Sequence, residues 1–154
     1  MLEQIDHVNL VVRDLPKMVA FYTEVLGFQV TKEVTISGEW VESVVGLQDV
    51  EADVVYLDLP AGPRVELIRY RSPACAEPQD ENTAHLFGLR HLAFRVSDID
   101  ATVERLHNFG AVFHSPVSTV PTSQVQYAGG ARKRLVYFRD PEQNLLELCE
   151  YKAS

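Results

Sequence analysis

The chain has 154 residues, of which 46% are hydrophobic, and a formal net charge of −8 with a pI near 5.0. This length fits one ordinary globular domain, and the apolar share is too high for a disordered protein. No apolar run approaches the roughly 20 residues that cross a bilayer, and the acidic balance argues against a general nucleic-acid surface. Membrane-spanning and general nucleic-acid-binding classes are therefore excluded.

Export and disulfide stabilisation are not expected either. The N-terminus has no basic stretch followed by an apolar one, so the sequence predicts no signal peptide. The two cysteines, Cys75 and Cys149, are too few for a disulfide framework. We expect reduced thiols and a cytoplasmic location.

The chain contains an internal repeat. Residues 5–14 and 89–98 both place a histidine early in an apolar strand and an aspartate seven residues later. Each aspartate is a predicted N-cap, and a glycine follows each predicted helix as a stop signal. The predicted helices run from Leu15 to Leu26 and from Ile99 to Phe109.

The far ends of the two copies also match. Glu66 and Glu147 each follow a tyrosine by ten residues and precede another tyrosine by four. The separations from the repeated histidines, His7 and His91, are 59 and 56 residues. Chance explains one such coincidence but hardly all of them.

These signals predict an α+β fold of two tandem βαβββ modules in a single domain, 1–154. Module 1 covers about residues 4–70 and module 2 about 89–151, joined by a linker at 71–88 that contains prolines and polar residues. The residues from 118 to 132 are expected to form a long loop beside a site. The strands are expected near residues 5–12, 28–35, 52–59, 64–70, 90–96, 111–115, 134–139 and 145–150.

Four residues are candidate metal ligands: His7, Glu66, His91 and Glu147. Side chains alternate across a strand, so each candidate points away from the apolar neighbours that face the helix. A carboxylate in such surroundings needs a compensating charge. A single histidine or glutamate in a strand is more often a hydrogen-bonded or salt-bridged residue than a metal ligand. Its repetition at equivalent positions of both copies favours a shared metal site. Two imidazoles and two carboxylates suit one divalent Zn, Ni, Co, Mn or Fe ion.

Other polar residues have simpler interpretations. His85, His107 and His114 have no repeat partner and are expected to be ordinary loop or surface residues. Cys149 is expected to be a buried structural thiol. The basic run 132–134 is usually a solvated surface, with contact to an anionic substrate as the alternative.

The sequence resembles the vicinal oxygen chelate superfamily, also called the glyoxalase/bleomycin-resistance/dioxygenase group. The resemblance covers nearly the whole chain and rests on several short motifs that are specific as a set. They are Asp6-His7-Val8, Phe21-Tyr22 through Val25-Leu26-Gly27-Phe28, Val65-Glu66-Leu67, Arg90 to Val96, and Asp140 to Asn144 through Leu146-Glu147-Leu148.

The resemblance implies paired modules whose sheets form a cup around a divalent metal, a small-molecule substrate and a homodimer. The ligand set is similar to that of bacterial glyoxalase I, whereas acyl-CoA epimerases usually have Gln in place of Glu66. It implies an isomerase or lyase that moves a proton next to a carbonyl through a metal-stabilised enolate or enediolate. By the same analogy Glu147 is the first choice for the catalytic base and Glu66 the second.

Two alternatives remain open. One is an Fe(II) or Mn(II) extradiol-type dioxygenase, although such enzymes typically use only two His and one Glu. The other is a non-catalytic protein that binds a drug or other small molecule in an apolar cup. Aromatic side chains that could line such a cup are Trp40, Tyr56, Phe113 and Tyr127.

Overall fold

The structure is a computed structural model, and it describes residues 4–75, 84, 88–89 and 91–153. The chain divides into two compact units, residues 1–79 and 80–154. The expected linker lies largely outside the described residues, as does His85. No helix in the described ranges has the length and apolar character that crossing a bilayer requires.

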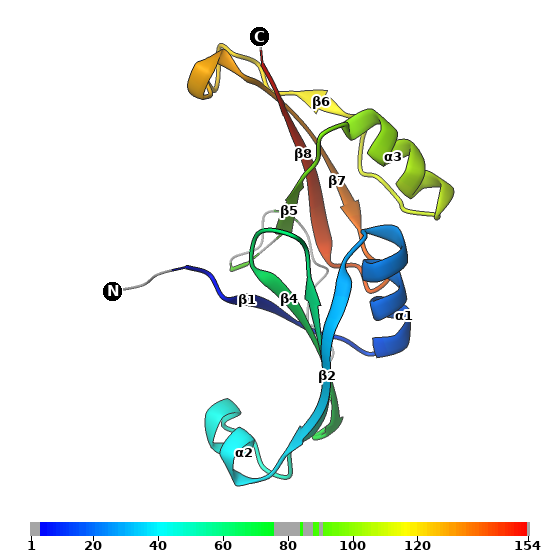
Figure 1. Cartoon of the computed structure of the whole chain (residues 1–154), viewed down its shortest axis with the longest axis vertical. Coiled ribbons are helices and arrows are strands. Elements are labelled where there is room, and N and C mark those ends of the chain that lie inside the picture. The colour runs from blue at the N-terminus through cyan, green and yellow to red at the C-terminus, as the bar shows by residue number, and fades with distance from the viewer. Residues whose placement is uncertain (1–3, 76–83, 85–87, 90, 154) are drawn as a thin grey trace. The chain divides into compact units, whose positions relative to one another are not determined.

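The first unit contains four strands and its helices in the order that the repeat predicts, with one helix added (Figure 1). Its elements are β1 (His7–Val11), α1 (Leu15–Ala20), the π-helical turn η1 (Phe21–Val25), β2 (Gln29–Ser37), α2 (Glu39–Val45), β3 (Glu51–Asp58) and β4 (Arg64–Ser72). The sheet order is β1-β4-β3-β2. The first strand is parallel to β4, and the other pairs are antiparallel.

The second unit repeats this topology with the sheet order β5-β8-β7-β6. Its elements are β5 (His91–Arg95), α3 (Ile99–Asn108), β6 (Ser118–Thr119), the 3₁₀ turn η2 (Ala128–Gly130), β7 (Arg132–Arg139) and β8 (Leu145–Lys152). Again the first strand, β5, is parallel to the last strand, β8. The mixed α+β fold with two βαβββ repeats is therefore confirmed.

Both predicted helix starts are confirmed by their caps. The side chain of Asp14 accepts a hydrogen bond from the Lys17 backbone N–H at 3.1 Å, and that of Asp98 accepts one from Ala101 at 3.0 Å. These bonds satisfy N–H groups that have no partner inside the helix.

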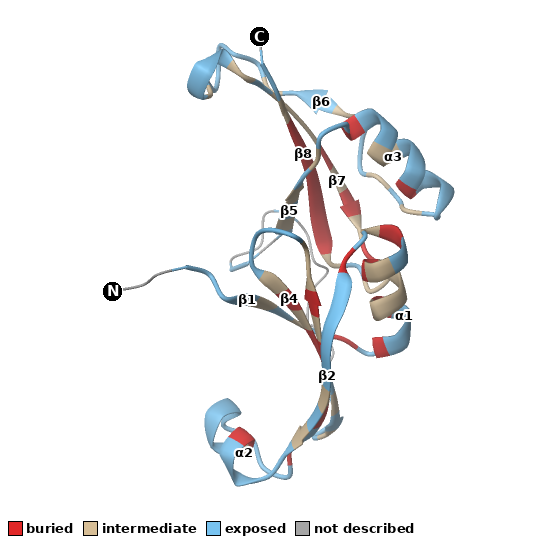
Figure 2. Cartoon of the chain, viewed as in Figure 1, coloured by how far each residue is buried: buried red, intermediate tan, exposed pale blue. Residues whose placement is uncertain are grey.

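Each unit buries its core between its helix and one face of its sheet. In the first unit Met18 and Tyr22 of the helical segment lie buried, as do Leu57 and Leu67 of the sheet. In the second unit the fully buried residues include Ile99, Leu106, Phe138, Leu146 and Leu148. Figure 2 shows this burial along β8, most of which is inaccessible to solvent. The helix-facing side is thus occupied by packing, and strand alternation places the four predicted ligands on the opposite face.

One expectation was wrong, and one helix was not foreseen. Residues 111–115 do not form a strand, because Phe113 makes only an isolated bridge with Phe138 and the edge strand β6 comes later. Helix α2 had not been expected; it buries only Val41 and leaves Trp40 and Val44 exposed. At seven residues α2 is too short for its apolar positions, such as Trp40, Val41 and Val44, to establish the periodicity on which such a prediction depends.

A buried carboxylate on the helix-facing side of β8 ties the second unit together. Glu150 is 1% exposed and accepts hydrogen bonds from the Ile99 backbone N–H at 3.2 Å and from Arg134 at 3.3 Å. Arg134 also forms two hydrogen bonds of 2.6 and 2.7 Å with Asp100. The arginine therefore links the start of α3 to the sheet.

Replacing Arg134 with Gln should destabilise the protein by about 2 kcal/mol, because it removes a charge-assisted bond from a buried carboxylate. Urea unfolding followed by circular dichroism measures the change. Arg132→Gln removes the same charge from an exposed position on the same strand and is the matched control. Equal stability of the two variants would contradict this role.

Candidate metal centre

The parallel strand pair in each unit brings one predicted histidine against one predicted glutamate. In the first unit β1 and β4 pair so that His7 lies opposite the residue two places before Glu66. The pairing of β5 with β8 gives His91 and Glu147 the same offset. The Nε2–Oε2 distances are 3.3 Å for His7–Glu66 and 3.2 Å for His91–Glu147. We call these contacts the first and second His–Glu pairs.

The first pair is fixed by two further polar side chains. The Asn9 amide donates a hydrogen bond to Glu66 Oε2 at 3.1 Å. Asp6 Oδ2 lies 2.9 Å from His7 Nδ1, which orients the ring so that Nε2 faces Glu66. The glutamate side chain is 13% exposed and the histidine 42% exposed, so the pair is open to solvent from the imidazole side.

The second pair lies deeper and has a cation beside it. The Glu147 side chain is 5% exposed, and Lys133 Nζ lies 2.9 Å from its Oε1. This contact places a positive charge beside the carboxylate, but Oε1 accepts no hydrogen bond of regular geometry among the described residues. Burial acts to lower the pKa of Lys133, but the close contact with the negatively charged Glu147 outweighs it and raises that pKa. Lys133 is therefore an ammonium ion at neutral pH.

A tyrosine stands directly across the sheet from each glutamate. Tyr56 pairs with Glu66, and Tyr137 pairs with Glu147. Burial raises the pKa of both phenols, and the neighbouring carboxylate raises it further in each case. Both tyrosines therefore stay protonated and can donate a hydrogen bond beside the pair.

Comparison with known proteins supports the assignment of the fold. The sequence model of the Glyoxalase/Bleomycin resistance protein/Dioxygenase superfamily matches residues 4–148. The chain belongs to this superfamily. The resemblance inferred from the motifs is thus confirmed.

Similar proteins span nearly the whole chain. The protein YwkD of Bacillus subtilis is 31% identical over 97% of this chain and 98% of its own length. The crystal structure of a glyoxalase family protein from Bacillus cereus is 30% identical, covers 98% of this chain and 95% of that one, and superposes with a TM-score of 0.82. A 2-epi-5-epi-valiolone epimerase from Actinomyces sp is 29% identical over 97% of this chain and 80% of its own.

Within this superfamily member the four predicted ligands come together as two pairs, one in each unit. Among the residues that the structure describes, no group of three or more His, Cys, Asp or Glu side chains is placed to hold a metal. The joint four-residue site therefore stays a prediction.

The basic run expected to be solvated has three different environments. Arg132 is exposed, and Arg134 is engaged by Asp100 and Glu150 on the helix side. Lys133 lies on the other face against Glu147. Alternation along β7 separates the three, so only Lys133 adjoins a His–Glu pair.

Several residues near the pairs had not been singled out as functional. Asp6 and Asn9 contact the first pair, and adjacency to the repeated histidine was the signal that could have found them. His114 was expected to be an ordinary loop residue, but its ring meets Tyr137 edge-on at 6.4 Å. Arg139 donates a hydrogen bond to His114 Nε2 at 3.2 Å.

The four aromatic residues considered for an apolar cup have separate surroundings. Trp40 is 60% exposed on α2, and Tyr56 adjoins Glu66. In the second unit Phe113 packs on the buried Phe138, whereas Tyr127 packs on Tyr151. Only Tyr56 adjoins a His–Glu pair, so an aromatic-lined cup finds little support within either unit.

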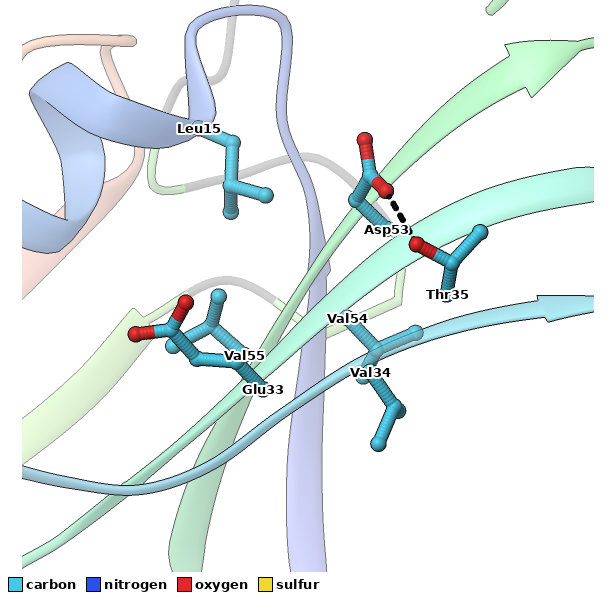
Figure 3. A pocket seen from close by; sticks show the side chains of 7 residues that line it. All are labelled: Leu15, Glu33, Val34, Thr35, Asp53, Val54 and Val55. Carbon is cyan, nitrogen blue, oxygen red and sulfur yellow. Dashed lines mark hydrogen bonds between the residues drawn. The ribbon is translucent and has the colours of Figure 1, made fainter.

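A hollow of about 300 Å³ lies on the first unit beside the start of α1 (Figure 3). Its polar lining includes Thr35, which donates a hydrogen bond to Asp53 at 2.8 Å. Arg71 binds the other Asp53 oxygen at 2.7 Å. The hollow contains none of the predicted ligands, and of its two acids, Glu33 and Asp53, the latter is already paired, so we assign it no catalytic role.

Replacing Glu66 with Gln should lower the pKa of Tyr56 towards its usual value. The substitution removes the carboxylate charge, while the burial that contributes most to the raised pKa remains. NMR titration of protein labelled with ¹³C-tyrosine measures the shift. Glu24→Gln, at an exposed position of the same unit, should leave it unchanged. An unaltered Tyr56 in the Glu66 variant would contradict the contact.

Proposed function

We propose that the chain is a divalent-metal-dependent isomerase or lyase that moves a proton next to a carbonyl group. The observation that carries the proposal is the same His–Glu contact, formed at the same strand register, in both repeats. A structural ion pair gives no reason for such duplication, whereas a metal held by both repeats does.

The residues present fit a divalent metal. If neutral His7 donates its Nδ1 proton to Asp6, then Nε2 presents a lone pair to a carboxylate oxygen 3.3 Å away. Two acceptors at this distance need a cation, and a metal ion satisfies both. His7, Glu66, His91 and Glu147 would hold it through nitrogen and oxygen atoms suited to Zn, Ni, Co, Mn or Fe. When bound, such an ion polarises a carbonyl oxygen as a Lewis acid.

Glu147 is the better candidate for the base that removes the proton. Glu66 Oε2 is held by the Asn9 amide, whereas the equivalent neighbour of Glu147 is Ala93, which has no side-chain donor. Glu147 therefore has no counterpart of the Asn9 hydrogen bond, and its close polar neighbour is Lys133, whose Nζ lies 2.9 Å from Oε1.

The two tyrosines can assist at the substrate oxygen. Tyr56 and Tyr137 keep their phenol protons at neutral pH because burial and the adjacent carboxylates raise both pKa values. A phenol O–H donates to an oxygen on which negative charge develops. The similar protein named as an epimerase from Actinomyces sp supports this proposal, since a proton transfer next to a carbonyl is one way to invert the configuration of a carbon.

The metal content of protein purified without chelator tests the shared site. We expect about one divalent metal per chain, held by ligands from both repeats. His7→Ala and His91→Ala should each lose it, while the exposed His107→Ala should keep it. Elemental mass spectrometry gives the ratio. Absence of metal after reconstitution would refute the metal centre. Two metals per chain, one lost in His7→Ala and the other in His91→Ala, would refute a site shared by both repeats.

Replacing Glu147 with Gln should lower turnover at least ~100-fold, the usual effect of losing a general base. The metal should remain, since an amide oxygen still binds it. Deuterium incorporation next to the carbonyl, followed by NMR in D₂O with a panel of 2-oxoaldehydes and 2-substituted acyl thioesters, measures proton transfer. Glu104→Gln on the exposed side of α3 is the matched control. Full exchange in the Glu147 variant would remove it as the base.

A further inference from the structure

The sheet faces that carry the two His–Glu pairs have the same backbone register but different side chains. Val11 pairs with Ile68 at the position where Arg95 pairs with Cys149. Ala52 pairs with Tyr70 at the position where Lys133 pairs with Tyr151. Two apolar residues of the first repeat are thus replaced by two cations in the second.

In the first repeat this side of the sheet is an apolar cluster. Ala52, Val54 and Ile68 are buried there, and Val34, Ile36, Tyr56 and Tyr70 pack against them. The fold therefore does not need charge at these positions. The cations of the second repeat call for a functional explanation.

The two cations converge on one aromatic ring. The Arg95 guanidinium carbon lies 5.3 Å and Lys133 Nζ 5.8 Å from the centroid of the Tyr151 ring. Cation–π attraction stabilises each of them there. Among the described residues, Glu147 is the one carboxylate within ion-pair distance of Lys133, and Arg95 has none. The patch therefore carries excess positive charge on a protein whose net charge is −8.

We propose that Arg95 and Lys133 form an anion subsite beside the second His–Glu pair, which binds a carboxylate or phosphate group of the substrate. Arg95 is exposed and offers a planar fork that fits either group, and Lys133 adds a point charge. Because Lys133 also touches Glu147, a bound anion lies next to the proposed base. The proposal rests on the proposed function and narrows its substrates to anionic carbonyl compounds.

Anion binding to metal-free protein tests the subsite independently of turnover. Inorganic phosphate and malonate are titrated separately into the full chain, and the arginine Nε–Hε signals are followed by NMR. We expect binding of at least one anion, weakened at least tenfold in Arg95→Gln and in Lys133→Gln. The tighter anion identifies phosphate or carboxylate as the group recognised.

Arg132→Gln is the matched control, because it removes a cation adjacent to Lys133 in sequence but on the opposite face. It should bind the anions as the unmodified protein does. Arg95 is exposed, so its variant tests the proposal even if Lys133→Gln fails to fold. The subsite would be overturned by any of three results. They are an unchanged anion affinity in Arg95→Gln, an equal loss of affinity in Arg132→Gln, or no binding of either anion to the unmodified protein. A failed metal measurement alone would overturn only the proposed function.

Discussion

The parallel pairing of the first and last strands in each repeat is the constraint on which the candidate centre depends. It places residues that are 59 and 56 positions apart in sequence at neighbouring points on one sheet face. A slip of one residue would turn the glutamate towards the helix and bury a carboxylate in the core. The buried Val65 and Leu67 prevent this, since they would lose their place against the helix.

The two repeats share the same sheet order and strand register, and a few side chains make them chemically different. Asn9 holds one glutamate, whereas its counterpart Ala93 leaves the other without that donor. Lys133 compensates the charge of Glu147 where the first repeat has Ala52. The backbone thus fixes the position of both carboxylates, and the neighbouring side chains give them different surroundings.

The sequence was most informative where local rules act. Caps at Asp14 and Asp98 and glycines after the helices predicted both packed helices, although η1 closes the first with π-helical geometry. It was least informative for α2, whose seven residues are too few to establish a helical period. Residues 111–115 contain the β-branched and aromatic residues typical of a strand. Phe113 nevertheless packs its ring on Phe138 and forms only an isolated bridge with it, so no further strand hydrogen bonds follow.

By itself the sequence determined the repeat, the helices, most strands and the face on which each candidate ligand lies, because these follow from periodicity and capping over a few residues. Tertiary structure alone decided which side chains meet. Arg132, Lys133 and Arg134 are indistinguishable as a basic run, yet one is exposed, one contacts Glu147 and one binds Asp100 and Glu150. The physical reason is that such contacts depend on the register of strands and helices distant in sequence, which no local pattern encodes.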